Sequence, residues 1–339
     1  MLMLLSGHSD VVSPSSHPLL SVAGLAFPIF LCANLLFVVF WVLFKPKGVL
    51  IPVAGLLLCY GPVRRYAPLN PSAEVPRGAI KVLSYNVHCF GKGNESYCDP
   101  KDNGIARYLY DSGADIICLQ ESACGMKERV DTLMRHRYPY KEITYCGGSS
   151  DMLTLYSKYP ILEVENIKYD SQTNLSVAYW LDVDGRKVLL VNNHLESNKL
   201  TATERDEFKK MVKGDGMRQN SDRIVDKLVV AFRKRGPQAD SVAAYIDRNA
   251  AGHPVILCGD FNEGPISYSH YRFRKRLTDC YTATGRGPGW SFHSNAIYVR
   301  IDNIMCSEHF EPYACKVDRS IALSDHYPIY CWLKLHAKP

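Results

Sequence analysis

The pattern of hydrophobic and polar positions divides the chain near residue 79. Residues 19–44 contain no charged side chain. This length exceeds the roughly 20 apolar residues that a helix needs to cross a hydrocarbon core about 30 Å thick, so the pattern predicts a transmembrane helix. Residues 48–63 are also uncharged. They predict either a short second helix that completes a hairpin, which we favour, or a segment that lies in the membrane interface. The lipid bilayer is therefore an expected partner.

The segments that flank this apolar region are polar or irregular. Residues 1–18 carry no Lys or Arg, which argues against a signal peptide and predicts an N-terminal tail. Residues 64–78 contain several prolines and predict a linker. Lys45 and Lys47, between the apolar segments, compete with Arg64 and Arg65, which follow them. The positive-inside rule therefore gives only a slight preference for the external or periplasmic face of the cell membrane for the rest of the chain.

From residue 79 to residue 339, short apolar runs alternate with charged, amphipathic stretches. The apolar runs predict strands at 80–87, 115–120, 140–146, 152–157, 161–168, 177–183, 187–194, 255–262, 298–306 and 328–335. The amphipathic stretches predict helices at 103–111, 124–136, 202–213, 218–235 and 238–250. Several strands in succession favour a mixed or antiparallel sheet. One large domain over 79–339 is the expected organisation.

Composition and charge exclude some classes of protein. With 47% hydrophobic residues, the chain can form a sizeable core. Five of the 40 basic and two of the 34 acidic residues lie before residue 79, so the large domain has an excess of only three positive charges. That excess is unlike the dense cationic surface of a high-affinity nucleic-acid binder. The basic runs Arg233–Arg235 and Arg272–Arg276 are interpreted as solvated helix ends, with phosphate contacts as the alternative. The cysteine spacing matches no zinc site.

Candidate chemistry gathers where predicted strands end. The run Val255–Asn262 has Asp260 and Asn262 two positions apart. If the strand geometry continues, both side chains point to the same face. A carboxylate beside an amide suits hydrolysis of a phosphate ester. Polar residues of the same kinds lie at the ends of other predicted strands: Asn86, Glu121 and His194 where their strands stop, and Asp325 and His326 directly before the last strand. Turn preference alone does not account for so many such endings.

These motifs resemble the endonuclease/exonuclease/phosphatase superfamily. The order is the one seen in that superfamily: Leu83-Ser84-Tyr85-Asn86-Val87-His88, Leu119-Gln120-Glu121, Asn193-His194-Leu195, Gly259-Asp260-Phe261-Asn262, Arg300-Ile301-Asp302 and Ser324-Asp325-His326. The resemblance covers about residues 79–336. It implies an α+β fold of the DNase I type, a four-layer α/β/β/α sandwich with the active site at one end, here in a membrane-anchored bacterial member.

The resemblance also implies a role for each motif residue. Glu121 is expected to be the principal ligand of a divalent cation, most plausibly Mg²⁺ with Mn²⁺ as a substitute, and Asn86 and Asp325 complete or border that site. Asp260 is expected to activate the attacking water, and Asn262 to hold the water or a phosphate oxygen. His194 and His326 would donate hydrogen bonds to the non-bridging phosphate oxygens. Asp302 would fix the tautomer of His326.

The expected function is that of a membrane-anchored, metal-dependent phosphoric ester hydrolase. Its substrate would be a phosphodiester or phosphomonoester, cleaved by in-line attack of water. A nuclease is slightly favoured, and a phospholipid or inositol-phosphate phosphoesterase is the alternative. A catalytically silent, membrane-attached binding module is the alternative from another class. The presence of Glu121, Asp260 and His326 argues against it. No protein partner is evident.

Overall fold

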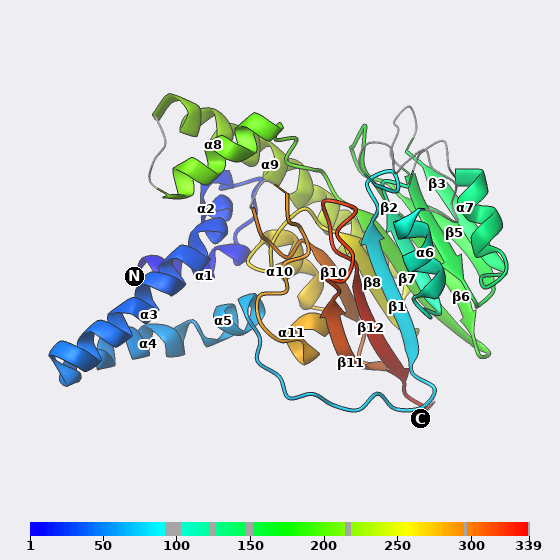
Figure 1. Ribbon diagram of the computed structural model, residues 1–339, viewed down its shortest axis with the longest axis horizontal. Helices are drawn as coiled ribbons and strands as arrows, with labels where there is room; N and C mark the ends of the chain where they lie inside the picture. The colour runs from blue at the N-terminus through cyan, green and yellow to red at the C-terminus, as the bar shows by residue number, and fades with distance from the viewer. Residues whose placement is uncertain (92–102, 123–126, 147–151, 214–217, 295–296, 338–339) are drawn as a thin grey trace.

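Two mixed β-sheets pack face to face with helices on their outer faces, as the computed structural model shows (Figure 1). The structure describes residues 1–91, 103–122, 127–146, 152–213, 218–294 and 297–337. The expected α+β sandwich is confirmed. A hydrophobic core lies between the sheets and two further cores lie under the outer helices.

The first sheet has the strand order β11-β12-β1-β2-β4-β3. Its strands are β1 (Ile80–Asn86), β2 (Ile116–Gln120), β3 (Tyr140–Tyr145), β4 (Met152–Ser157), β11 (Phe310–Val317) and β12 (Ile329–Leu335). Strands β1 and β2 are parallel, so both of their C-terminal ends reach the same edge. Helices α6 (Gly104–Asp111) and α7 (Lys127–Met134) cover the outer face. There Ile105 and Leu109 pack with Leu83 and Leu119.

The second sheet has the strand order β5-β6-β7-β8-β10-β9. Its strands are β5 (Ile161–Ile167), β6 (Leu175–Val183), β7 (Arg186–His194), β8 (Val255–Asp260), β9 (Thr278–Asp279) and β10 (Asp302–Cys306). Parallel strands β7 and β8 are joined through α8 (Ala202–Lys213) and α9 (Arg218–Asn249). Val242 and Ile246 of α9 pack against Leu189 and Leu257 of the sheet. Short helices α10 (Tyr268–Arg274) and α11 (Cys280–Thr284) follow β8.

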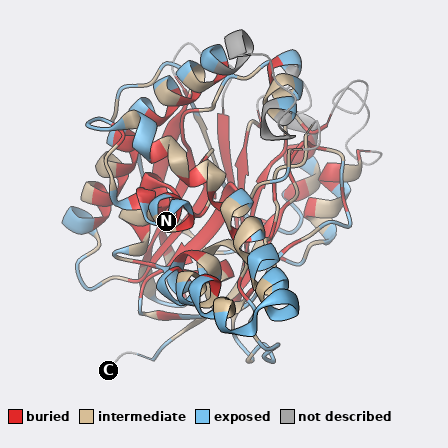
Figure 2. Ribbon diagram, turned by 90° about the vertical axis from the view of Figure 1, so that its left-hand side faces the viewer, coloured by how far each residue is buried: buried red, intermediate tan, exposed pale blue. Residues whose placement is uncertain are grey.

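The central strands are buried on both faces, which Figure 2 shows as red ribbon through the middle of the sandwich. Strands in this position read as continuous apolar runs, which explains why β2 and β8 were easily recognised from the sequence. Cys118 of β2 and Cys258 of β8 are fully buried and lie in the core between the sheets, where a thiol acts as a small hydrophobe. The buried thiols of Cys118, Cys258, Cys280, Cys306, Cys315 and Cys331 form no disulfide bonds.

Several predicted boundaries differ from those in the structure. The helices predicted at 218–235 and 238–250 form one helix, α9, with Pro237 inside it. Pro237 is exposed, while Arg235 and Gln238 on either side are buried and hydrogen-bonded, so tertiary contacts outweigh the helix-breaking tendency of proline. The strand predicted at 298–306 begins only at Asp302. Of the helix predicted at 124–136, residues 124–126 lie outside the described residues.

The N-terminal residues form a helical unit of their own. Helices α1 (Leu2–Gly7), α2 (Pro18–Val22), α3 (Phe27–Phe44), α4 (Leu50–Leu58) and α5 (Tyr60–Tyr66) are joined by 3₁₀ turns at Ser9–Val11, Ala23–Ala26 and Pro46–Val49. Residues Pro18–Phe44 are long and apolar enough to cross a membrane, and the helices of the second apolar segment bend by 67° at their junction. Figure 1 shows α3 and α4 projecting together from the sandwich.

Candidate active site

The C-terminal ends of four strands from both sheets meet at one end of the sandwich. Asn86 ends β1 and Glu121 follows β2, whereas His194 ends β7 and Asp260 ends β8. The Asn86 side-chain nitrogen donates to Glu121 Oε1 at 3.0 Å and to Asp260 Oδ2 at 3.2 Å. One amide therefore joins a carboxylate of its own sheet to a carboxylate of the other, so the site lies across the junction of the two sheets.

The backbone around these strand ends is unusual. Glu121 and Asn262 adopt left-handed conformations with φ of 50° and 52°, which are uncommon for residues with a Cβ and concentrate at functional sites. Gly259 precedes Asp260 with φ of 125°, and a Cβ at this position would lie 2.0 Å from the carbonyl oxygen of Asn193. Only glycine allows β7 and β8 to approach so closely, and this approach sets His194 beside Asp260.

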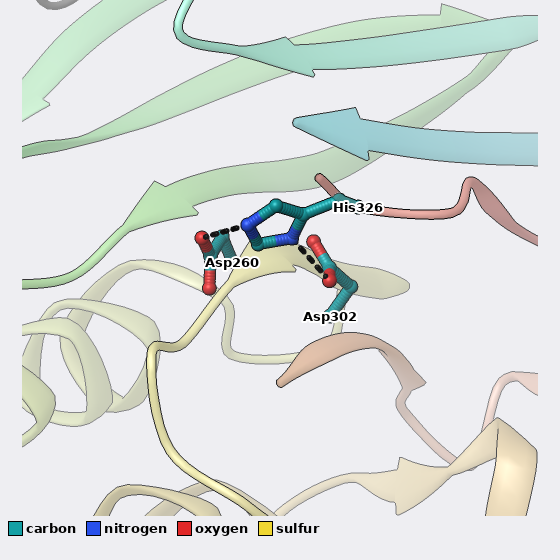
Figure 3. Close-up of side chains that lie close together, drawn as sticks. All are labelled: Asp260, Asp302 and His326. Carbon is teal, nitrogen blue, oxygen red and sulfur yellow. Dashed lines mark hydrogen bonds and ion pairs between the residues drawn. The ribbon is translucent and has the colours of Figure 1, made fainter. Parts of the chain in front are cut away.

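Asp260, His326 and Asp302 form a buried row of side chains (Figure 3). Asp260 and Asp302 lie opposite each other on antiparallel strands β8 and β10. His326 Nδ1 is 2.8 Å from Asp302 Oδ2, and His326 Nε2 is 3.7 Å from Asp260 Oδ2. A carboxylate on Nδ1 fixes the orientation of the imidazole ring and directs its other nitrogen toward Asp260.

The electrostatics of this row favour a proton on His326 at neutral pH. Burial and the charge of Asp302 raise the pKa of Asp260, His326 and His194 lower it, and the pKa is about 6 as the net result. Burial works against a charged His326, but Asp302 and Asp260 outweigh it and raise the pKa of the imidazole to about 10. His326 is therefore a cationic hydrogen-bond donor at neutral pH, beside a carboxyl group suited to accept a proton.

Glu121 has the opposite electrostatic environment. Burial would raise its pKa, but a hydrogen bond from His88, the charge of His194 and a hydrogen bond from Asn86 hold the pKa well below the usual range. His88 Nδ1 lies 3.3 Å from Glu121 Oε2 and 3.6 Å from Asp325 Oδ1. Glu121 is thus an ionised carboxylate, and its side chain remains 34% exposed and open to solvent.

The donor set around Glu121 fits a hard divalent cation. Glu121 and Asp325 supply carboxylate oxygens, and Asn86 supplies an amide whose oxygen and nitrogen can exchange places by rotation. The carboxylates of Asp260 and Asp302 and a ring nitrogen of His326 also lie within 4.8 Å of one another. His326 Nδ1 already bonds to Asp302 Oδ2, so this nitrogen is engaged within the row.

His194 and Asn262 complete the end of the sandwich. His194 Nε2 is 3.7 Å from Glu121 Oε1 and 3.8 Å from Asp260 Oδ2. The backbone N–H of Asn262 donates to Asp260 Oδ1 at 2.8 Å, and its side-chain nitrogen donates to Leu195 O at 2.9 Å. In the structure Asn262 therefore ties the β8 loop to the β7 loop, and its contact with the attacking water or a phosphate oxygen stays a prediction.

Sequence reasoning missed an arginine at the rim of the site. Arg205, on α8, lies 3.9 Å from Asp325 Oδ2 and 3.2 Å from Ser294 Oγ, with its guanidinium 5.3 Å from the centre of the Phe292 ring. The Phe292 ring in turn packs edge-on to His326 at 5.1 Å. A single arginine on an amphipathic helix carries no sequence signal for this placement.

Arg235 is buried, and its interpretation as part of a solvated helix end was wrong. Its guanidinium is 2.8 Å from Glu263 Oε1, 2.6 Å from the carbonyl oxygen of Glu196 and 2.9 Å from Asn198 Oδ1. These partners belong to the loops that follow β7 and β8. The other basic run is also engaged, because Arg272, Arg274 and Arg276 each pair with an aspartate. These arginines are structural ion-pair partners, and none is a free phosphate contact.

Comparison with known families identifies the class of the protein. Residues 83–326 match the model of the endonuclease/exonuclease/phosphatase family, so the chain belongs to this family of phosphoesterases. Residues 1–66 match a separate family, described as a domain of unknown function (DUF8431). No curated protein matches the chain significantly.

Solved structures share the fold at low sequence identity. The human nocturnin catalytic domain with bound sulfate is 17% identical, with a TM-score of 0.58, over 78% of this chain and 96% of that one. TDP2 from D. rerio, complexed with a single-strand DNA product, is 17% identical with a TM-score of 0.53, over 76% and 99%. A family protein from Leptotrichia buccalis is 15% identical with a TM-score of 0.52, over 76% and 100%.

Proposed function

We propose that the chain is a membrane-anchored phosphoric ester hydrolase that requires a divalent metal ion, Mg²⁺ with Mn²⁺ as a substitute. One observation carries this proposal: Asn86 joins two carboxylates whose pKa values are shifted in opposite directions. When the pKa values of two neighbouring carboxyl groups are shifted apart, the group with the lowered pKa stays charged and can bind a cation. The group with the raised pKa can accept a proton. The ionised Glu121 suits the metal, and Asp260 suits the attacking water.

The roles of the side chains follow from their positions. Glu121, Asn86 and Asp325 would hold the cation, which would supply charge stabilisation to a phosphoryl group in line with the attacking water. Asp260 would accept the proton of that water. His194 and His326 would donate hydrogen bonds to the non-bridging oxygens as negative charge develops. Asp302 would orient the ring of His326 and keep it protonated, and Asn262 would position the loop that carries Asp260.

Two substrate classes remain candidates, each favoured by a different observation. A structural neighbour bound to a DNA product favours a nucleic acid, although at 17% identity the likeness covers only the fold. The exposed apolar hairpin of α3 and α4 favours a phospholipid or inositol phosphate at a membrane surface. Lys45 and Lys47 at the hairpin turn support a cytoplasmic turn and an external catalytic domain.

The activity test compares these substrates side by side. The full chain in mild detergent is incubated with plasmid DNA, sphingomyelin or inositol phosphates, in Mg²⁺ and in EDTA. We expect hydrolysis of one class in Mg²⁺ and loss of that hydrolysis in EDTA. Equal turnover in Mg²⁺ and EDTA would contradict metal dependence. Absence of turnover for every phosphoester would instead support a binding module.

Replacement of the principal metal ligand tests the site directly. Glu121→Ala should lower the Mg²⁺-dependent kcat/KM at least about a hundredfold, because loss of groups that only orient metal ligands already costs roughly 10–100-fold. Circular dichroism and thermal unfolding in EDTA should show a folded protein. Glu308→Ala, at an exposed glutamate away from the site, is the matched control and should behave as wild type. Unchanged activity of Glu121→Ala would remove Glu121 from the mechanism.

Arg205 provides a test of substrate binding at the rim. Arg205→Ala should raise KM about tenfold with a smaller change in kcat, because a charge-assisted hydrogen bond to phosphate contributes roughly 1.5–3 kcal/mol. Arg205→Lys should recover part of the loss, since it keeps the charge. Lys210→Ala removes an exposed cation from the same helix and should leave KM unchanged. An equal effect of both alanine variants would indicate general electrostatic attraction and no specific contact.

A further inference from the structure

The N-terminal unit, residues 1–66, shares a hydrophobic core with the catalytic domain. Met3, Phe27, Leu31 and Cys59 are buried in one cluster with Ile266, which lies between β8 and α10. Helix α2 also packs against α9, and the turn Ser9–Val11 packs against α10. A helical anchor on a loose tether would not bury these side chains against the domain that it carries.

A buried aspartate pairs with two arginines at this junction, and the three residues come from separate parts of the chain. Asp10 is 1% exposed, and its Oδ2 lies 3.0 Å from Arg65 and 2.8 Å from Arg274. Asp10 belongs to the segment before the apolar helices, Arg65 to the helix after them and Arg274 to α10. A carboxylate taken out of water with two guanidinium partners requires defined geometry to be favourable. The junction is therefore a specific fit between these three segments.

The junction extends to the strand that carries a site residue. Arg300 donates to the backbone carbonyl of Arg65 at 2.6 Å and lies 3.1 Å from Asp279 Oδ2. Arg300 is fully buried and stands two residues before Asp302. The last helix of the N-terminal unit thus contacts the segment that leads into β10.

The N-terminal unit packs closely against the catalytic domain at two glycines, Gly24 and Gly236. A Cβ at Gly24 would lie 2.2 Å from the carbonyl oxygen of Ile266. A Cβ at Gly236 of α9 would lie 2.7 Å from the Pro14 side chain. Both distances are too short for a real Cβ, so only glycine fits at these two positions, where the N-terminal unit packs against the catalytic domain.

The projecting part of the hairpin is short. Its exposed apolar side chains include Leu36, Phe37, Leu43, Phe44, Ile51 and Leu57. Beyond Leu31, the last buried residue of α3, the helix continues to Phe44, a rise of about 20 Å at 1.5 Å per residue. This is less than the hydrocarbon thickness of about 30 Å. Insertion of these side chains therefore draws the catalytic domain against the membrane surface.

We propose that residues 1–66 are a rigid mount that holds the active site at a fixed distance and angle from the bilayer. This inference rests on the membrane anchoring in the proposed function, but not on hydrolysis. The mount presents its apolar hairpin to lipid, while Asp10, Gly24 and Arg65 hold the catalytic domain in place. The enzyme would accordingly meet phosphoesters at the membrane surface.

Energy transfer to the bilayer tests this arrangement. The full chain is reconstituted into phosphatidylcholine vesicles that contain an acceptor-labelled lipid, with a donor dye attached through an unnatural amino acid at Glu308, an exposed residue. Time-resolved transfer should give one narrow distance distribution for wild type. In Gly24→Ala the distribution should broaden by an amount of the order of 20 Å, the r.m.s. end-to-end distance of a free segment of about 12 residues.

Gly61→Ala is the matched control, because a Cβ there meets only Arg65 Nη1 at an ordinary 3.4 Å. Asp10→Asn is a second variant that should broaden the distribution without adding volume. A broad distribution for wild type, or narrow distributions for both Gly24→Ala and Asp10→Asn, would overturn the rigid mount. If the protein did not float together with the vesicles in a density gradient, that result would instead contradict membrane anchoring. Hydrolysis is measured separately, so absent activity leaves this result interpretable.

Discussion

Asp260→Asn should lower kcat by about a thousandfold, within the range of roughly 10²–10⁴ that a positioned general base contributes. Asparagine has the shape of aspartate but cannot accept the proton of the attacking water. The amide can still accept the backbone N–H of Asn262, which Asp260 Oδ1 accepts at 2.8 Å, so the loop should keep its conformation. The measurement is steady-state hydrolysis at saturating substrate in Mg²⁺.

The same substitution should make the metal-free protein more stable at neutral pH. Burial raises the pKa of Asp260 from 3.8 to about 6, so ionisation above pH 6 weakens the folded state. A neutral asparagine removes this cost, and the expected gain is about 1–3 kcal/mol. The gain should be full above pH 6 and should fade as the pH falls from 6 to 4, because Asp260 then takes up a proton in the folded wild type.

Urea unfolding in EDTA at pH 4, 6 and 8 measures this dependence. Asp170→Asn changes an exposed aspartate and should show no such gain. A variant that loses activity and stability together would indicate that Asp260 supports the fold, and would contradict its assignment as the proton acceptor. Gain of stability with loss of activity is the pattern expected of a residue kept for function.

Arg235→Ala should lower the free energy of unfolding by about 3–5 kcal/mol, the usual cost of removing one partner of a buried ion pair. The substitution leaves Glu263 buried and unpaired and removes hydrogen bonds to Glu196 O and Asn198 Oδ1. Because these partners lie in the loops after His194 and Asp260, kcat/KM should fall as well. Urea unfolding and hydrolysis of the same preparation give both values.

The control for Arg235→Ala is its near neighbour on α9. Arg233→Ala removes an exposed arginine two residues away and should change stability by less than about 0.5 kcal/mol. In the double variant Arg235→Met/Glu263→Leu, both charges are replaced by apolar groups, and much of the lost stability should return. Failure of the double variant to recover stability would point to the hydrogen bonds with the β7 loop as the main contribution.

The fold was accessible from the sequence where strands are buried on both faces. Strands β1, β2, β7 and β8 each contain a run of buried apolar residues, and each ends in or is followed by a polar residue of the candidate site. Strand β11 was missed, since its residues alternate irregularly between buried and exposed positions and a register shift occurs after Tyr313. Helices α10 and α11 are too short for a periodic signal.

Only part of the candidate site could be predicted from the sequence, because some of its residues are placed by the packing of helices and not by the strands. The order of the motifs and their family resemblance grouped Asn86, Glu121, His194 and Asp260 in one site, and in the structure the parallel pairs β1–β2 and β7–β8 bring their ends together. The contribution of Arg205 depends on how α8 lies over the rim, and that of Arg235 depends on which face of α9 is buried. Neither placement is encoded in local residue pattern. The docking of residues 1–66 likewise depends on contacts between distant segments, such as Asp10 with Arg274.

Strand β12 has a consequence for the order of events during synthesis. It fills the place between β1, the first strand of the sandwich, and β11, and Asp325 and His326 immediately precede it. Until β12 has been synthesised and has left the ribosome, it cannot pair with β1 and His326 cannot reach Asp302. The helices of residues 1–66 leave the ribosome before β12 does. On the proposed membrane anchoring, these helices could therefore meet the bilayer before the protein is active, and catalytic competence should begin only once β12 pairs with β1.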